Sequence, residues 1–354
     1  MKRQMMKGNE AIAEAAVRAG CRYFFGYPIT PQNEIPEYMS KRLPEVDGVF
    51  LQAESEVSAI NMVYGAAGAG ARVMTSSSSP GISLKQEGIS YIAGAELPCV
   101  IVNMVRGGPG LGSIQPAQSD YYQATRGGGH GDYRMPVYAP STVQEAVDLV
   151  QKAFDIADKY RTPVMVLGDG VIGQMMEPVE MPEFSEKALP EKEWAAKGWK
   201  KGGERKRAVI NSLYIQADAC EKQNLKLQAN YDAMQKEEIM VDTEFMDDAE
   251  IAVVAYGTTA RIALTAVRRL REQGVKVGLI RPITLWPFPT KAIADACSHV
   301  KKFLTVEMSL GQMIDDVKIS VNGARPVSFY GRSGGIIPGV REIAEQIELL
   351  KEGL

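Results

Sequence analysis

The sequence predicts an α/β protein made of two doubly wound parallel-sheet domains, and three observations lead to this prediction. Short apolar strands alternate with helical segments along most of the 354 residues, which is typical of parallel sheets with right-handed crossovers. Continuous apolar runs at 99–105 and 164–167 are typical of strands buried on both faces. The composition becomes strongly charged after residue 181. We therefore expect an α/β domain over 1–181, a charged, partly helical connector over 182–247 and a second α/β domain over 248–354.

The first domain is expected to open with a helix, a strand, a turn and a second helix. Alanine and isoleucine recur at helical spacings over 9–19, and Gly20 follows as a helix end. An aromatic strand over 23–27 runs into a proline, where a strand must end or turn, and a helix over 34–39 follows. The same alternation predicts strands at 49–51, 73–75, 99–105 and 164–167, and helices at 54–69, 84–95 and 143–159.

The second half repeats this alternation after a polar segment. The connector contains a polar helical stretch over 216–238 and a basic run over 200–207, which we interpret as solvated surface. A buried strand over 251–256 then begins the second domain. It is followed by predicted strands at 275–280 and 302–307, and by helices at 261–273, 290–297 and 313–321.

The charge and hydropathy of the chain exclude several classes of function. Lys and Arg together number 40 and Asp and Glu 43, so there is no basic excess to hold a nucleic acid. No apolar run approaches the roughly 20 residues that span a bilayer. The basic N-terminus is not followed by the apolar region of a signal peptide, so we expect a cytoplasmic protein.

The cysteines and histidines are too few and too scattered to form a metal site. The chain has 4 Cys and 2 His and no Cys-x-x-Cys pair. Iron–sulfur clusters need thiolates at close, recurrent spacing, and zinc needs clustered Cys and His. We therefore expect isolated thiols, and no metal ligands, from this chain.

Three loops at the carboxyl ends of predicted strands carry residues suited to chemistry. The loop over 26–31, Gly-Tyr-Pro-Ile-Thr-Pro, presents Thr30 between two prolines, although Thr30 could instead be the N-cap of the next helix. Glu54 and Glu56 lie at a strand-to-helix junction, where one could project into a site or both could simply complement the helix dipole. Arg106 follows the most apolar strand and could grip a carboxylate, pair with a nearby glutamate or extend to solvent.

Taken together and in order, these motifs resemble the pyrimidine-binding domain of the 2-oxoacid:ferredoxin oxidoreductases. The shared motifs are the loop over 26–31, Gln-x-x-Ser-Glu over 52–56, Thr-Ser-Ser-Ser-Ser-Pro-Gly over 75–81 and Arg-Gly-Gly-Pro over 106–109. The segment 277–289 resembles the family's transketolase C-terminal-like domain. The resemblance covers residues 7–175 and 249–345. Within the family it is strongest to the subunit of the 2-oxoisovalerate enzymes, with the 2-oxoglutarate subunit next.

The resemblance implies a role for each matching residue. Glu56 corresponds to the glutamate that hydrogen-bonds the aminopyrimidine ring of thiamine diphosphate and thereby promotes formation of the C2 ylid; Glu54 is the rival carboxylate. Thr30 corresponds to a residue that contacts the substrate oxygens, and Arg106 to the arginine that holds the substrate carboxylate. Pro28 and Ile29 correspond to loop residues near the cofactor.

The remaining parts of such an enzyme are expected on partner chains. The family's diphosphate motif is Gly-Asp-Gly followed by an Asn, whereas here Gly-Asp-Gly at 168–170 is followed by no Asn over 190–205, so we interpret it as a strand-end turn. Thiamine diphosphate would thus be shared with a pyrophosphate-binding subunit, with Mg²⁺ and iron–sulfur clusters on partner chains that include a ferredoxin-like gamma subunit. Coenzyme A and ferredoxin would complete the reaction.

Two alternatives stay open. The substrate could be 2-oxoglutarate or another 2-oxoacid; a dicarboxylate would need a second cation, for which Arg126 or Arg134 is available, although the glycine-rich segment 126–131 could be a surface loop. The chain could also be a non-catalytic α/β scaffold subunit. A dehydrogenase is not expected, because no Gly-x-Gly-x-x-Gly follows the first strand.

Overall fold

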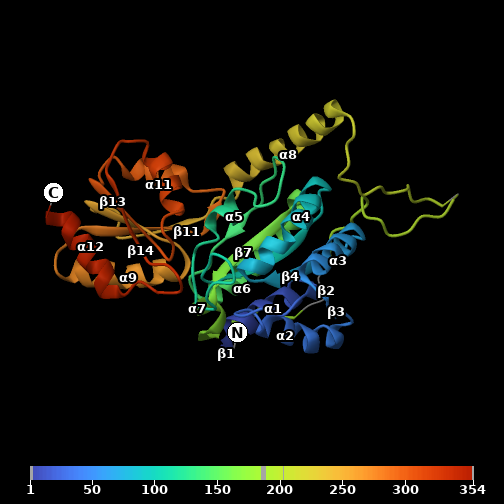
Figure 1. The fold of residues 1–354 in the computed structure, drawn as a ribbon, viewed down its shortest axis with the longest axis horizontal. Coiled ribbons are helices and arrows are strands. Elements are labelled where there is room, and N and C mark those ends of the chain that lie inside the picture. Colours follow the sequence, from blue (N-terminus) through green and yellow to red (C-terminus); the bar gives the residue numbers. More distant parts are fainter. Residues whose placement is uncertain (1–2, 185–188, 202, 353–354) are drawn as a thin grey trace.

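The computed structural model describes residues 3–184, 189–201 and 203–352, and it contains two α/β units (Figure 1). The first is built on a seven-stranded sheet, parallel except where β12 pairs antiparallel with β6. In sheet order its strands are β12 (Thr284–Trp286), β6 (Val137–Tyr138), β7 (Pro163–Asp169), β5 (Cys99–Val105), β4 (Val73–Ser77), β2 (Tyr23–Gly26) and β3 (Val49–Gln52).

Helices cover both faces of this sheet, as a doubly wound fold requires. On one face α1 (Gly8–Arg18) packs against α2 (Glu34–Arg42) and α6 (Val143–Tyr160); on the other, α3 (Glu56–Gly68) packs against α4 (Ser79–Gly94). The chain moves one way along the sheet from β2 to β3 and the opposite way from β4 to β5. The winding therefore reverses between β2 and β4, and ligands of open α/β sheets bind at the carboxyl ends of strands at such a point.

The centre of the first sheet is fully buried and mostly apolar. All seven residues of β5 and all seven of β7 are buried, as the uninterrupted apolar runs predicted for a strand covered on both faces. Burial of these strands between two helical layers fixes the carboxyl edge of the sheet as a rigid platform for the loops that follow β2, β3, β4 and β5.

The second unit is a five-stranded sheet that is parallel except for β9. In sheet order its strands are β14 (Val327–Gly331), β13 (Lys302–Glu307), β10 (Ile251–Val254), β11 (Val277–Pro282) and β9 (Val241–Glu244). Its helices are α9 (Gly257–Glu272), α10 (Thr290–Ala296), α11 (Met313–Val321) and α12 (Val340–Glu352), with α12 packed on α9 and α10 on α11.

The α/β class and its two parallel sheets are confirmed, but each sheet carries an antiparallel edge strand that the sequence pattern did not predict. Strand β12 comes from the second half of the chain and completes the first sheet, while β9 lies within the predicted connector and completes the second. A separate two-stranded antiparallel sheet pairs β1 (Gln4–Lys7) with β8 (Met176–Val179). The division at residues 181 and 247 stays a prediction.

The connector carries the longest helix, α8 (Ala217–Glu237), which lies along the first unit (Figure 1). Only Leu227, Tyr231 and Met234 of this helix are buried, and the Tyr231 ring packs edge-on against Trp286 at 5.8 Å. The short helices α5 (Tyr121–Thr125) and α7 (Gly170–Gln174) and a 3-10 turn (Pro44–Val46) complete the fold. Among the described residues, no helix combines the length and apolarity that a membrane crossing needs.

Candidate active site

Three of the predicted site residues lie on loops that meet at one edge of the first sheet. Thr30 follows β2, Glu56 follows β3 and Arg106 follows β5. These parallel strands point the same way, so their carboxyl ends share an edge. The strands flank the point where the chain winding reverses, which makes this edge the candidate site.

Glu56 is a buried carboxylate at the start of a helix. It is the first residue of α3, whose N-cap is Ser55; the Ser55 hydroxyl accepts a hydrogen bond from the Ser58 amide at 3.2 Å. Glu56 is only 6% exposed, yet within the described part of the chain no side chain donates a hydrogen bond to its carboxylate. A buried carboxylate without a donor is costly, so this group is suited to a ligand that supplies one.

Glu54, the alternative carboxylate, is engaged elsewhere. Its side chain is exposed and accepts a hydrogen bond from the Ser58 hydroxyl at 2.6 Å, which lowers the pKa of the Glu54 carboxyl. The structure therefore presents Glu56, and not Glu54, to the interior of the site.

Gly81 lies directly against Glu56. A Cβ on Gly81, in the first turn of α4, would lie 2.1 Å from Ser77 Oγ and 2.7 Å from Glu56 Oε1, so only glycine fits there. The hydroxyls of Ser77 and Ser78 are buried, and neither has a hydrogen-bond partner among the described residues. Together with the Glu56 carboxylate, these hydroxyls can hydrogen-bond an aminopyrimidine ring, whose edge offers ring-nitrogen acceptors and one amino donor.

Arg106 ties two loops together and keeps spare donors. Its Nη1 donates to the Thr30 carbonyl and its Nη2 to the Leu111 carbonyl, both at 3.0 Å, while Nε is buried without a partner. The interpretation that Arg106 pairs with a glutamate or extends to solvent does not hold, because the residue is 6% exposed and its guanidinium donates to main-chain carbonyls. A guanidinium has five N–H groups, so donors remain for an anion.

The loop after β2 places Thr30 beside Arg106. Pro28 is exposed, whereas Ile29 and Thr30 are half-buried. Thr30 is not the N-cap of α2, because that helix begins at Glu34 and is preceded by Asn33. The alternative structural role proposed for Thr30 is therefore wrong; its hydroxyl accepts a hydrogen bond from Asn33 Nδ2 at 3.5 Å and keeps its own proton to donate to a ligand. The loop is anchored to β4 by a hydrogen bond from the Ser76 hydroxyl to Gln32.

Lys85 is a buried cation at the site that sequence reasoning did not identify. It lies in α4, is fully buried, and donates to Thr75 Oγ1 at 2.6 Å and to the Ser76 carbonyl at 3.1 Å. Burial lowers the pKa of its ammonium to about 7, an effect that the charge of Glu56 opposes. The only sequence signal is a lysine one turn after Gly81, on the helix face that packs inward.

An open cleft of about 510 Å³ extends from the Arg106 loop to the second unit. Asp120 lines it and accepts hydrogen bonds from Ser79 Oγ at 2.7 Å and Asn103 Nδ2 at 3.0 Å; burial raises the pKa of its carboxyl. From the second unit the cleft is lined by residues of 308–312 and 333–334. Its lining residues are largely hydroxyl-bearing or small, so it can admit a sizeable polar molecule toward Arg106.

The Gly-Asp-Gly triplet is a strand-end turn, as predicted. Asp169 closes β7 and caps α7, accepting hydrogen bonds from the amides of Val171 at 2.8 Å and Ile172 at 3.2 Å. Over the described ranges, no three His, Cys, Asp or Glu side chains lie close enough together to hold a metal ion.

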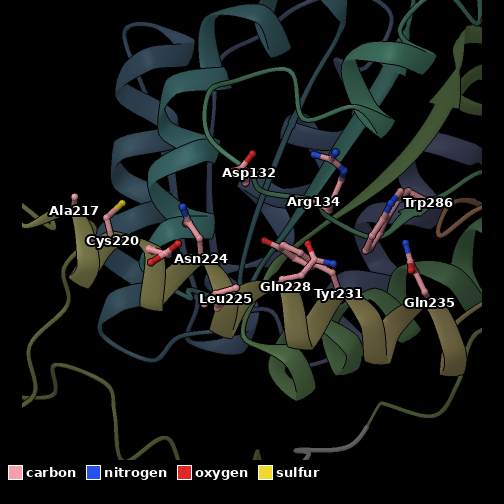
Figure 2. A pocket seen from close by; sticks show the side chains of 11 residues that line it. Asp132, Arg134, Ala217, Cys220, Asn224, Leu225, Gln228, Tyr231, Gln235 and Trp286 are labelled. Atoms are coloured by element: carbon pink, nitrogen blue, oxygen red, sulfur yellow. The ribbon is translucent and has the colours of Figure 1, made fainter.

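The two arginines considered as a second substrate cation lie at other cavities. Figure 2 shows Arg134 at a cavity of about 790 Å³ between α8 and the loop at 132–134, with Tyr231 and Trp286. Arg126 lines a third cavity and pairs with Asp316 at 2.9 Å. Neither cavity shares a lining residue with the cleft beside Arg106.

Two family profiles cover most of the chain. The profile of the pyruvate flavodoxin/ferredoxin oxidoreductase, thiamine-diphosphate-binding family matches residues 14–243. The profile of the pyruvate:ferredoxin oxidoreductase core domain II matches residues 249–343.

Curated relatives match over almost the full length. The ketoisovalerate oxidoreductase subunit VorB of Methanothermobacter thermautotrophicus is 50% identical over 98% of this chain and 97% of its own. The 2-oxoglutarate synthase subunit KorA of the same organism is 38% identical over 97% of each chain.

Two solved structures share the fold. The 2-oxoglutarate:ferredoxin oxidoreductase from Magnetococcus marinus, solved with 2-oxoglutarate, coenzyme A and succinyl-CoA bound, is 24% identical and has a TM-score of 0.86. The match covers 98% of this chain and 65% of that one. A split-gene transketolase is 15% identical, with a TM-score of 0.61 over 97% of each chain.

Proposed function

Because the chain belongs to the 2-oxoacid:ferredoxin oxidoreductase family of enzymes, we propose that it is the pyrimidine-binding subunit of a complex that oxidises 2-oxoisovalerate. The complex would decarboxylate the branched 2-oxoacid, transfer the acyl group to coenzyme A and pass two electrons to ferredoxin in the cytoplasm. The observation that carries this proposal is the buried Glu56 carboxylate, which lies against Gly81 and receives no hydrogen bond from the described residues.

The residues of this chain fit the pyrimidine half of thiamine diphosphate. Glu56 would hold a proton at a ring nitrogen, and the Ser77 hydroxyl beside it would supply a further hydrogen bond. Pro28 and Ile29 would border the ring from the loop after β2. When bound, thiamine diphosphate supplies the electron sink for the carbanion that decarboxylation leaves.

Arg106 and Thr30 would orient the 2-oxoacid. The guanidinium is held in place by the Thr30 and Leu111 carbonyls, so its remaining N–H groups are fixed in direction before substrate binds. A preorganised guanidinium grips a carboxylate with two hydrogen bonds. Thr30 would contact the substrate oxygens from the same loop.

The other half of the cofactor site would come from a pyrophosphate-binding subunit. The described residues contain no cluster suited to Mg²⁺, and Cys21, Cys99, Cys220 and Cys297 lie as free thiols. Four apolar side chains on β3, α3 and α4 are also exposed: Val49, Leu51, Val57 and Leu84 are 42–53% exposed. Exposed apolar side chains on the elements that carry Glu56 and Gly81 would suit a surface that a partner covers. Mg²⁺ and the iron–sulfur clusters would lie on that subunit and on a ferredoxin-like gamma subunit.

Sequence identity to the two relatives and the charges that line the cleft both favour the branched substrate over 2-oxoglutarate. Identity to the ketoisovalerate subunit is 50%, against 38% to the 2-oxoglutarate subunit. The cleft beside Arg106 is not lined by Arg126 or Arg134, the two cations that a second carboxylate could have used. A desolvated second carboxylate without a cation would be strongly disfavoured.

The test is a parallel assay of the complex, co-purified with its partner subunits, on 2-oxoisovalerate, 2-oxoglutarate and pyruvate. We expect the highest kcat/KM for 2-oxoisovalerate, no activity from the isolated chain and loss of activity in Glu56→Gln. A preference for 2-oxoglutarate would overturn the substrate assignment. Full activity in Glu56→Gln would overturn the site and leave the non-catalytic scaffold as the better interpretation.

A further inference from the structure

Lys85 is a fully buried cation that the proposed mechanism does not use. Its ammonium lies among Thr75 Oγ1, the Ser76 carbonyl and the charge of Glu56, with the Cys99 thiol as the other titratable neighbour. Burying a charged lysine side chain completely carries a large desolvation cost. Met or Leu at this position would fill the same space without that cost.

The geometry directs this ammonium toward the site. Side chains of a helix tilt toward its N-terminus, so Lys85 extends over the preceding turn of α4, which contains Gly81. Gly81 is the residue whose Cβ would contact both Glu56 Oε1 and Ser77 Oγ. The Nζ bonds to Thr75 and Ser76 hold the charge at the carboxyl half of β4, directly before those contacts.

We propose that Lys85 is a positioning residue for Glu56: its buried charge, held by Thr75 and Ser76, stabilises the anionic carboxylate and so favours transfer of the proton to the cofactor ring. This inference rests on the proposed function, because it assigns Lys85 a role only if Glu56 contacts the pyrimidine ring. The two groups form no direct ion pair among the described residues, so Lys85 acts through the field and leaves the carboxylate oxygens free for the ligand.

Among the groups in contact with the Lys85 ammonium, none changes its charge near neutral pH, whereas Lys85 does. Cys99 on β5 stays a neutral thiol, because burial raises its pKa to about 12. Thr75 and Ser76 on β4 do not titrate, and Glu56 on α3 is the carboxylate on which Lys85 acts. The ammonium form dominates below about pH 7 and is lost above it. The influence of Lys85 on Glu56 should therefore fade as pH rises.

The experiment measures hydrogen–deuterium exchange at C2 of thiamine diphosphate bound to the assembled complex, without 2-oxoacid, so that it reports on proton transfer and not on turnover. The variants are Lys85→Gln, which keeps a hydrogen-bond donor but removes the charge, and Lys85→Met, which matches the length. Lys226→Gln makes the same change at an exposed lysine that pairs with Glu96, and it is the matched control. Glu56→Gln tests the proposed function in the same assay. Titration calorimetry of thiamine diphosphate checks that each complex still binds the cofactor.

At about pH 6 we expect both Lys85 variants to exchange at least about tenfold more slowly than wild type, which corresponds to about 1.4 kcal/mol. Lys226→Gln should stay within about twofold. The deficit of the Lys85 variants should shrink as pH rises through neutrality, because wild type then loses the charge as well.

The outcomes separate the two claims. Wild-type exchange in Lys85→Gln at low pH, with Glu56→Gln impaired, overturns the role of Lys85 and leaves the proposed function standing. A deficit of equal size at every pH, or one shared by Lys226→Gln, also overturns it, because a packing role has no pH dependence. Normal exchange in Glu56→Gln overturns the proposed function itself. If Lys85→Met does not assemble, Lys85→Gln decides the question.

Discussion

Gly81 lies so close to Glu56 that a single methyl group between them would fall 2.7 Å from the Glu56 carboxylate and 2.1 Å from the Ser77 hydroxyl. Both distances are shorter than van der Waals contact. The glycine of the motif over 75–81 is thus explained by space and not by backbone conformation, because its φ is not in the left-handed region. Helix α4 approaches the start of α3 at this point because no side chain intervenes.

Gly81→Ala should therefore impair cofactor binding. The new methyl group must displace Glu56 or Ser77, and overpacking of this kind costs about 1–3 kcal/mol. We expect the Kd for thiamine diphosphate, measured by calorimetry on the complex, to rise at least about tenfold. Gly65→Ala in α3 is the matched control: nothing lies within 4 Å of its Cβ, so binding should be unchanged and the helix slightly more stable. Equal effects of the two substitutions would contradict this account.

Glu56 and Glu54 should differ sharply in their contribution to activity. Glu56 is buried and lacks a donor, while Glu54 is exposed and bonded to Ser58. Glu56→Gln should lower kcat by about 10²-fold or more, the usual scale for a group that moves a proton in the reaction. Glu54→Gln should keep kcat within about twofold. A larger loss in Glu54→Gln would mean that the two carboxylates have been assigned the wrong way round.

Arg106→Lys tests whether the guanidinium geometry matters for substrate binding. A lysine ammonium cannot span the carbonyls of Thr30 and Leu111 and grip a carboxylate with two parallel bonds. We expect KM for the 2-oxoacid to rise by about 10–100-fold while the Kd for thiamine diphosphate stays near wild type. Arg126→Lys, which pairs with Asp316 outside the cleft, should leave KM unchanged. A normal KM in Arg106→Lys would remove Arg106 from the substrate site.

Most of the architecture followed from local patterns, and the failures have a physical cause. The long apolar strand β5 and the amphipathic helix α6 begin and end within a few residues of their predicted bounds. The strands β9 and β12 were missed because they are short, and because their partners lie far away in sequence. Pairing of an edge strand is decided by tertiary contact and leaves little trace in local periodicity.

The candidate site was predictable where a loop follows a strand and unpredictable where a side chain comes from within a helix. Thr30, Glu56 and Arg106 each follow a predicted strand, so the topology of a parallel sheet brings their loops to one edge. Lys85 lies inside α4, where a lysine ordinarily faces solvent, and only its packing against β4 reveals that it is buried. The sequence could not predict either that the Glu56 carboxylate receives no hydrogen bond, because this depends on which donors reach it in space.

Gln118 is one of the residues that join the two units. Its Nε2 donates to the Tyr256 carbonyl at 2.9 Å, and its Oε1 accepts from Thr259 Oγ1 at 2.7 Å and from the Met308 amide at 2.9 Å. Gln118→Ala should leave these buried partners unsatisfied, at a cost of roughly 2–3 kcal/mol. We expect a lower Tm and faster amide exchange at Met308. Gln115→Ala, an exposed neighbour, should change neither. Slow exchange at Met308 in Gln118→Ala would mean that the other contacts between the units, such as the Arg126–Asp316 ion pair, hold this segment without Gln118.

The buried Lys85 amine should also make the free energy of unfolding depend on pH, whatever reaction the protein takes part in. Its folded pKa, about 7, lies below the ordinary value of 10.5, so between these values the unfolded chain binds a proton that the folded chain does not. Stability of the wild type therefore rises with pH across this window, and the cost of the buried amine is fully present below about pH 7. Lys85→Met removes that cost.

The stability advantage of Lys85→Met over wild type should be greatest below about pH 7 and should shrink toward pH 10.5, by at most about 1.4 kcal/mol per pH unit. Chemical denaturation of the two proteins at a series of pH values measures it. Lys226→Gln retains the buried amine, so its stability difference from wild type should not vary with pH in this way. A pH-independent difference between Lys85→Met and wild type would show that Lys85 keeps its ordinary pKa in the folded protein, and would remove the charge switch on which its influence over Glu56 depends.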